Sequence, residues 1–194
     1  MKRLLISASL AAVAALPSTA NAQAIPPAVV AVVDLDRVQT ECTACKTARD
    51  ALKAQVLAQD NREKALAGPL QTEQQSLQTA VDALKGKDPD AALQARIRTF
   101  QTKMQSAQEE AARGRQQLQR NQAYIAQQVQ AKLNPIYTQV MQRRGANVLV
   151  EQGATLATAQ SVDVTNDVLA ALNAAMPTLS VTAPAAPANT TQGR

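Results

Sequence analysis

The sequence predicts an α+β fold in which a long antiparallel helical hairpin, with coiled-coil arms, stands on a small β body formed by oligomerisation. From Arg37 to Arg144 the chain is rich in Ala, Gln, Lys and Arg, and its clearest break is the stretch 85–90 (Lys-Gly-Lys-Asp-Pro-Asp). Short Val-rich runs at 29–33 and 148–150 flank this helical stretch. With one Phe, two Tyr and no Trp, the arms cannot supply a compact core. The layout favours a holding or scaffolding protein over an enzyme.

Residues 1–22 predict a signal peptide. Lys2 and Arg3 give a basic start, residues 4–16 an apolar segment, and Ala20-Asn21-Ala22 a small-x-small cleavage site. The apolar segment is shorter than the roughly 20 residues of a membrane-spanning helix, and no Cys lies near the cleavage site to carry a lipid. We expect a soluble protein exported to the bacterial periplasm, with an N-terminal interfacial helix as the alternative.

The predicted body comprises residues 28–39 and 145–175. Residues 28–35 form a Val-rich run that is too short for a helix and suits a strand buried on both faces. The next residues, 34–37, would make the turn out of this strand. Thr40 would then cap the first arm, with Glu41 in the first helical turn favouring the helix dipole.

The predicted arms comprise residues 40–144 and fold back at residues 85–90. Apolar residues of the second arm recur every 3.5 residues, which is typical of a coiled-coil seam: Leu93, Ile97, Phe100, Met104, Ala107, Ala111, Gly114 and Leu118. The first arm has a similar stripe, interrupted by polar Gln59, Glu63 and Glu73: Leu52, Val56, Leu66, Leu70, Leu77, Ala80 and Leu84. Gly68-Pro69 and Asn134-Pro135 predict joints, because proline removes a backbone donor.

Gly145 is expected to end the second arm. Strands are then predicted at 146–151 and within 155–164, followed by a short amphipathic helix capped by Thr165. Residues 176–194 are dominated by Pro, Ala and Thr, so this tail should be disordered.

The few short strands predict an oligomer. Two or three strands alone are barely stable in water, and the arms contribute little core. Several copies that pool their strands into one closed sheet would bury apolar surface and remove exposed strand edges.

Charge is distributed unevenly between the arms. Residues 34–85 carry 7 basic and 8 acidic side chains, whereas residues 86–144 carry 10 basic and 4 acidic ones, a difference of +6. Without Lys2 and Arg3, 18 basic residues face 15 acidic ones, which gives a net charge of +3. A cationic arm outside the cytoplasm suits lipopolysaccharide, anionic lipid or acidic polypeptide as partners, and no nucleic acid. A solvated face that promotes solubility is the alternative.

The sequence predicts neither an enzyme nor a cofactor or metal site. It contains no His, which removes the usual general base and the commonest metal ligand. Asp34 and Asp36 lie at a strand end, where a structural role is expected.

Cys42-Thr43-Ala44-Cys45 is the sharpest local signal. A local structural disulfide, or small-residue packing, is the first interpretation of Cys42 and Cys45 in an oxidising compartment. A redox role is the second, because a helix N-terminus lowers the pKa of a thiol. A zinc site is the third and would need ligands from other subunits.

The order of motifs resembles the OmpH/Skp family of periplasmic chaperones. A signal peptide precedes Val-Val-Asp-Leu-Asp-Arg-Val at 32–38, then come the hairpin, Arg-Gly-Ala-Asn-Val-Leu-Val at 144–150 and Val-Asp-Val-Thr-Asn-Asp-Val-Leu at 162–169. The resemblance covers roughly residues 28–173. It implies a homotrimer whose three helical arms enclose a cavity and hold unfolded outer-membrane proteins without ATP. The Cys pair, the Gly68-Pro69 joint and the Pro/Ala-rich tail depart from the family pattern, which leaves the cavity shape and any redox role open.

Within this resemblance, some arm residues are expected to contact clients. Leu57 and Val81 lie off the main stripe, which favours outward-facing apolar surface, and basic residues of the second arm would line it. The alternative is that all apolar side chains are used between the two helices. The candidate client-binding residues are Leu57, Leu66, Leu70, Leu77, Val81, Leu84, Leu93, Arg96, Ile97, Arg98, Phe100, Lys103 and Met104.

The predicted function is that of an ATP-independent periplasmic holdase chaperone, which binds unfolded outer-membrane proteins between its arms and prevents their aggregation. The alternative is a structural coiled-coil adaptor or spacer of the cell envelope. A third candidate is a thiol oxidoreductase that works through Cys42 and Cys45.

Overall fold

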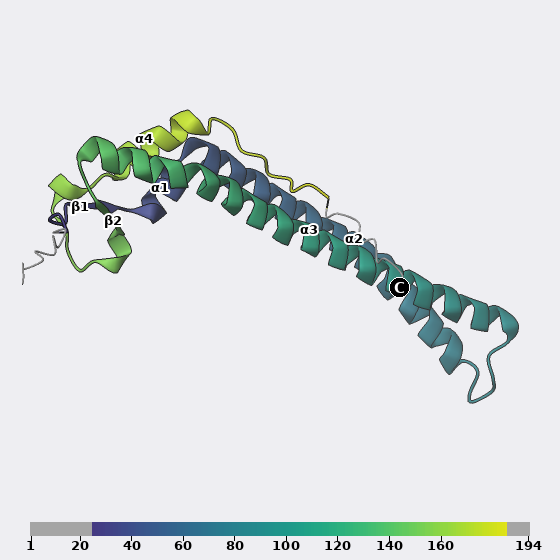
Figure 1. Ribbon diagram of the computed structural model, residues 1–194. Helices are drawn as coiled ribbons and strands as arrows, with labels where there is room; N and C mark the ends of the chain where they lie inside the picture. Colours follow the sequence, from purple (N-terminus) through teal and green to yellow (C-terminus); the bar gives the residue numbers. More distant parts are fainter. Residues whose placement is uncertain (1–24, 186–194) are drawn as a thin grey trace, which may run out of the picture.

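The computed structural model describes residues 25–185, so the predicted signal peptide and residues 186–194 of the predicted tail lie outside the described residues. Two antiparallel helices, α2 (Thr43–Asp82) and α3 (Ala91–Arg144), form an arm that projects from a small body (Figure 1). The body contains β1 (Val30–Val33), α1 (Leu35–Glu41), β2 (Val148–Glu151), the 3-10 turns η1 (Gln152–Ala154) and η2 (Gln160–Val162), and α4 (Thr165–Ala175). The fold is mostly helical with a small sheet, as predicted; a body completed by other copies remains a prediction.

The sheet has two parallel strands. Val30 pairs with Val148 and Val33 with Glu151. On the other side of β1, the Val164 N–H donates to the Val32 carbonyl at 2.8 Å, which makes a single bridge rather than a strand. The prediction of strands within 155–164 is therefore wrong, because this segment reaches the edge of β1 at only one place and forms η2 before it.

The first helix begins earlier than predicted. The Asp34 carboxylate accepts the Arg37 N–H at 2.8 Å, so Asp34 caps α1 where a turn was expected. The Thr40 hydroxyl donates to the Asp36 carbonyl inside α1, so Thr40 is not a cap. Cys42 is the N-cap of α2, and its sulfur accepts the Cys45 N–H. The helix thus starts in the body and is interrupted for one residue before the arm.

Thr165 also has a different role from the predicted cap. It is the first residue of α4, is fully buried, and its hydroxyl accepts the Asp34 N–H at 2.9 Å. Asp163 accepts the Thr165 N–H at 2.8 Å. The hydrogen bond from Thr165 lowers the pKa of Asp163. These contacts join the start of α4 to the end of β1.

The core lies where the base of the arm meets the body. The buried residues of this cluster come from β1, α1, the start of α2, the end of α3 and α4: Ala31, Val33, Val38, Cys42, Ala44, Cys45, Val129, Leu133, Ile136, Val140, Val164, Val168, Leu172 and Met176. Leu133 and Leu172 are among its largest fully buried side chains. The arm is therefore anchored to the body by hydrophobic burial at its base.

The two predicted joints, Gly68-Pro69 and Asn134-Pro135, do not interrupt the helices. α2 runs through Pro69 and α3 runs through Pro135 as continuous helices. One missing backbone hydrogen bond is tolerated in a long helix that is supported along one side by its partner.

The two ends of the arm agree with the sequence. The tip turns at Lys85 and Gly86, both with positive φ, and Asp90 caps α3 by accepting the Leu93 N–H at 2.8 Å. At the base, Gly145 adopts a left-handed conformation with φ of 67°. Its N–H donates to Gln142 and the Ala146 N–H donates to Met141, which completes a Schellman motif.

The first part of the tail is ordered, contrary to prediction. After α4 the segment 176–185 runs back along the arm (Figure 1). Met176 is buried in the core, and Leu179 packs against it. The low apolar content of this tail is offset by hydrogen bonds between its main chain and side chains of α2 and α3.

Candidate functional site

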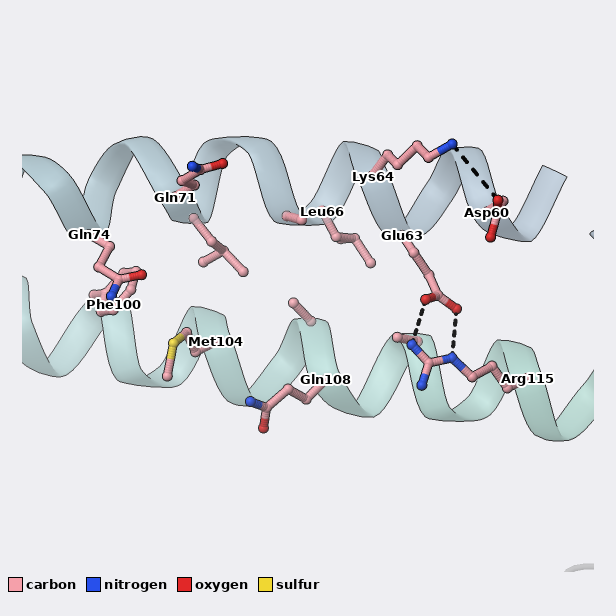
Figure 2. Close-up of a pocket in the computed structure, with 14 residues that line it drawn as sticks. Asp60, Glu63, Lys64, Leu66, Gln71, Gln74, Phe100, Met104, Gln108 and Arg115 are labelled. Atoms are coloured by element: carbon pink, nitrogen blue, oxygen red, sulfur yellow. Dashed lines mark hydrogen bonds and ion pairs between the residues drawn. The ribbon is translucent and has the colours of Figure 1, made fainter. Parts of the chain in front are cut away.

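An apolar hollow lies between the two helices near the middle of the arm. This open groove has a volume of about 550 Å³. Figure 2 shows Leu66 extending from α2 towards α3, with Phe100, Met104 and Gln108 on the facing helix. Its lining residues are Asp60, Glu63, Lys64, Leu66, Ala67, Leu70, Gln71, Gln74, Phe100, Met104, Ala107, Gln108, Ala111 and Arg115. Ala107 and Ala111 of α3 contribute only small side chains to this part of the seam, which therefore is not filled.

One end of the open groove is closed by an ion pair. Arg115 donates through Nε to Glu63 Oε1 at 2.9 Å and through a terminal nitrogen to Glu63 Oε2 at 2.5 Å (Figure 2). The hydrogen bond from Arg115, with a second from Gln59, lowers the pKa of Glu63 to about 2. The same pairing raises the pKa of Arg115. Glu63 therefore stays ionised across the physiological range and fixes the register of the two helices at this level.

A second hollow of about 340 Å³ opens beside the same apolar residues. Leu66, Leu70 and Ala107 line both hollows, and the second one adds Ala65, Pro69, Thr102, Lys103, Ser106 and Glu110. The apolar side chains at the centre of the arm are therefore accessible through two openings.

The seam on the body side of the hollows is polar. The amide end of Gln59 lies against Gly114, and a Cβ added to Gly114 would stand 2.2 Å from Gln59 Oε1, so a larger residue there would require Gln59 to move. Arg62 pairs with Glu110 across the helices. Asn121 is buried and donates to Gln55 Oε1 at 2.8 Å. These contacts fasten the arm without using apolar residues.

The structure brings together only some of the predicted client-binding residues. Leu66, Leu70, Phe100 and Met104 line the open groove, and Lys103 lines the second hollow. Leu77 and Leu93 are buried, and Leu84 and Ile97 are half-buried, outside both hollows. Leu57 and Val81 are exposed at 57% and 39% but line neither hollow. Val56, which the heptad pattern placed in the seam, is exposed at 48%.

The predicted basic lining is partly neutralised by α2. Glu73 lies 3.5 Å from an Arg96 nitrogen and 4.0 Å from Lys103 Nζ. Arg96 also donates to the Ser76 hydroxyl at 3.0 Å. Arg98 is exposed. The net charge of each arm did not predict this pairing, because Glu73 lies on α2 and its basic partners lie on α3.

Sequence reasoning also missed the polar rim of the open groove, which comprises Asp60, Glu63, Lys64, Gln71, Gln74, Gln108 and Arg115. The only signal was the interruption of the first-arm stripe at Glu63. That interruption marks the ion pair at the end of the groove.

Cys42 and Cys45 form a disulfide at the junction of α1 and α2. Cys42 has no exposed surface and Cys45 is only 8% exposed, since both belong to the core. This environment shields the bond from exchange with external thiols.

Within 25–185, no helix is both long enough and apolar enough to cross a membrane. The same residues hold no group of three or more His, Cys, Asp or Glu side chains placed to bind a metal ion.

Comparison with known proteins identifies the family. The model of the OmpH-like outer membrane protein family matches residues 29–172. A solved structure, described as a candidate OmpH-like outer membrane chaperone from Caulobacter crescentus CB15, superposes with a TM-score of 0.66 at 24% identity, covering 80% of this chain and 90% of that one. No curated protein matches the chain. Since the family model spans most of the sequence, the chain belongs to the OmpH-like outer membrane protein family.

Proposed function

We propose that this protein is an ATP-independent periplasmic holdase that binds unfolded outer-membrane proteins along its arm. The observation that carries the proposal is the open groove, where Leu66, Leu70, Phe100 and Met104 leave an apolar hollow of about 550 Å³ in the middle of a helical hairpin. A coiled coil that served only as a spacer would gain stability by filling such a gap. Membership of the OmpH-like family supports the same conclusion.

The chemistry of the groove suits unfolded outer-membrane strands. Such strands alternate apolar and polar residues. An apolar side chain of the client would enter between Leu66 and Met104, while its polar neighbours would meet the amides of Gln71, Gln74 and Gln108 at the rim. Each contact is weak and independent of sequence, so a client is held by many of them and released without a chemical step.

Assembly into a trimer is part of the proposal. Val29, Val30 and Val148 are exposed at 49%, 41% and 38% around the two-stranded sheet, and Leu156 is fully exposed nearby. A two-stranded sheet with apolar residues on its surface is stabilised when copies pool their strands. Three arms would then project from one shared body and surround a client.

The basic residues of α3 would attract anionic partners, either acidic client segments or the phosphates of lipopolysaccharide. Arg98 is the best probe, because Arg96 and Lys103 already face Glu73. Arg98→Glu should weaken client or lipid A binding in low salt, and the difference should shrink as salt screens it. The matched control is Lys132→Glu, which reverses another exposed charge of α3 at its base. Equal effects of both substitutions would mean that only net charge matters.

The decisive experiment is an aggregation assay with a urea-denatured porin, with the mass of the complex measured by light scattering on the same sample. A holdase suppresses aggregation at near-stoichiometric amounts and gives a mass of three chains plus client. Unchanged aggregation would instead support the envelope spacer. The porin assay contains no nucleotide, so it also tests independence from ATP.

A further inference from the structure

The ordered tail lies on a set of side-chain amides that bind its main chain. Gln128 Nε2 donates to the Ser180 carbonyl at 2.9 Å, and Gln128 Oε1 accepts the Ser180 N–H at 3.1 Å. Asn121 Oδ1 accepts the Ala183 N–H at 2.9 Å, and Gln55 Nε2 donates to the Val181 carbonyl at 3.4 Å. Asn121 is only 3% exposed and is oriented by its bond to Gln55. Within the described residues, these bonds between tail and arm all use the tail's main chain.

Main-chain recognition makes this surface independent of the bound sequence. Every polypeptide except at proline offers the same N–H and C=O groups. A Gln side chain that donates and accepts at one residue reproduces the reciprocal bonding of neighbouring strands. The same three amides can therefore hold an unfolded segment of any protein that reaches them.

The surface under the tail continues towards the tip. Beyond Thr182 lies a hollow of about 470 Å³, bounded by Gln55, Ala58, Arg62, Gly114 and Leu118 among others. Six residues of α3 that line these hollows or contact the tail share one helix face, because they are separated by three, four or seven positions. They are Lys103, Ser106, Glu110, Gln117, Asn121 and Gln128. The tail, the hollow beside Thr182 and the second hollow at Leu66 and Leu70 thus follow one another along one face of the hairpin, a path that the Arg62–Glu110 pair crosses between the two hollows.

We propose that this path, from Gln128 to Lys103, is a binding track for extended polypeptide, and that the chain's own segment 177–185 occupies its body end until an unfolded client displaces it. The inference rests on the proposed holdase function and adds a second binding surface, with an internal competitor. The tail is tethered, so it competes at a roughly millimolar effective concentration. Removing it therefore raises client affinity by a factor of one plus the ratio of this effective concentration to the tail's own dissociation constant, which the peptide titration measures.

The first arm of the test needs no client. A fluorescein-labelled 177–185 peptide is titrated by anisotropy into a chain that ends at Met176, which keeps the buried Met176 in the core. We expect saturable binding that Gln128→Ala weakens and Gln127→Ala does not, since Gln127 is an exposed neighbour without a tail contact. A peptide N-methylated at Ser180 and Ala183 should bind poorly, because it lacks both N–H donors. Absence of saturable binding, or equal binding of the methylated peptide, would overturn the track.

The second arm measures the affinity for urea-denatured porin of the full chain and of the chain ending at Met176, with circular dichroism to check the fold. A gain on truncation that matches this factor supports competition. Full-length Ser180→Pro removes the tail's N–H donor to Gln128 Oε1 and leaves the track intact, so it should gain in the same direction if the truncated chain is destabilised. Equal affinities for porin would contradict competition by the tail. Peptide binding without any porin binding would refute the holdase function while leaving the track intact, whereas porin binding without peptide binding would do the reverse.

Discussion

Replacing Met104 with Gln tests whether the open groove holds clients. Met104 lines the groove and is 36% exposed, so about a third of its surface remains for a client to cover. Fully burying a methionine side chain is worth about 1.5–3 kcal/mol, so the remaining third contributes about 0.5–1 kcal/mol. Gln has a similar length but replaces the apolar end with an amide. We expect Met104→Gln to weaken the binding of denatured porin by about twofold to fivefold.

The matched control for this experiment is Val56→Gln. Val56 is 48% exposed on the same arm but lies outside both hollows, so its replacement removes a comparable exposed apolar group elsewhere. Porin affinity is measured by anisotropy on samples whose melting curves and masses match the unsubstituted protein. Equal weakening by the two substitutions would show that diffuse apolar surface binds clients. A folded Met104→Gln variant with full affinity would remove the groove from the binding site.

Three further predictions concern the base of the arm, the ion pair and the disulfide. Leu133 is 1% exposed, so Leu133→Ala should lower the free energy of unfolding by about 2–5 kcal/mol in urea titrations. The control Leu57→Ala, at a position that is 57% exposed, should change this free energy by less than about 1 kcal/mol. Similar losses in both variants would mean that the arm is not anchored at its base. Arg115 lowers the pKa of Glu63 from 4.5 to about 2, so the contribution of this ion pair to folding stability is complete above pH 4.5 and is lost as the pH falls through 2. Over this window the melting temperature should decline more in the unsubstituted protein than in Glu63→Gln. Parallel plots of melting temperature against pH would contradict the pairing. Replacing both Cys42 and Cys45 with Ala opens a short loop and should lower the free energy of unfolding by roughly 2 kcal/mol, while porin affinity is retained. A folded variant that no longer binds porin would favour a functional, redox role for the two cysteines.

Features set by a few neighbouring residues could be predicted from the sequence. The turn at residues 85–90 and the end of α3 at Gly145 are such features, because the positive φ that Gly86 and Gly145 adopt depends on local chemistry. The caps at Asp34 and Cys42 were missed for the opposite reason. Several polar residues there can cap a helix, and the choice depends on the contacts that α1 makes with α4 and with the end of β1.

The groove could not be predicted because it depends on the register between α2 and α3. The pairs Glu63–Arg115, Arg62–Glu110 and Glu73–Arg96 fix this register, and each joins residues more than 20 positions apart. An interrupted heptad stripe in α2 leaves several alignments with similar apolar contact. The ordered tail was missed because composition measures apolar content, whereas this segment is held by hydrogen bonds between its main chain and the side chains of Gln128, Asn121 and Gln55.

The polar interruption of the seam explains how the arm stays folded while its apolar centre stays open. On the body side of the groove, Gln59 packs against Gly114, and Glu63 is bonded to Arg115. On the tip side, Leu77 and Leu93 are buried. These contacts on either side oppose both collapse and separation of the helices at Ala107 and Ala111, which favours the open seam there. A continuous apolar stripe in α2 would stabilise the hairpin more, but it would fill the seam and leave no apolar surface for a client.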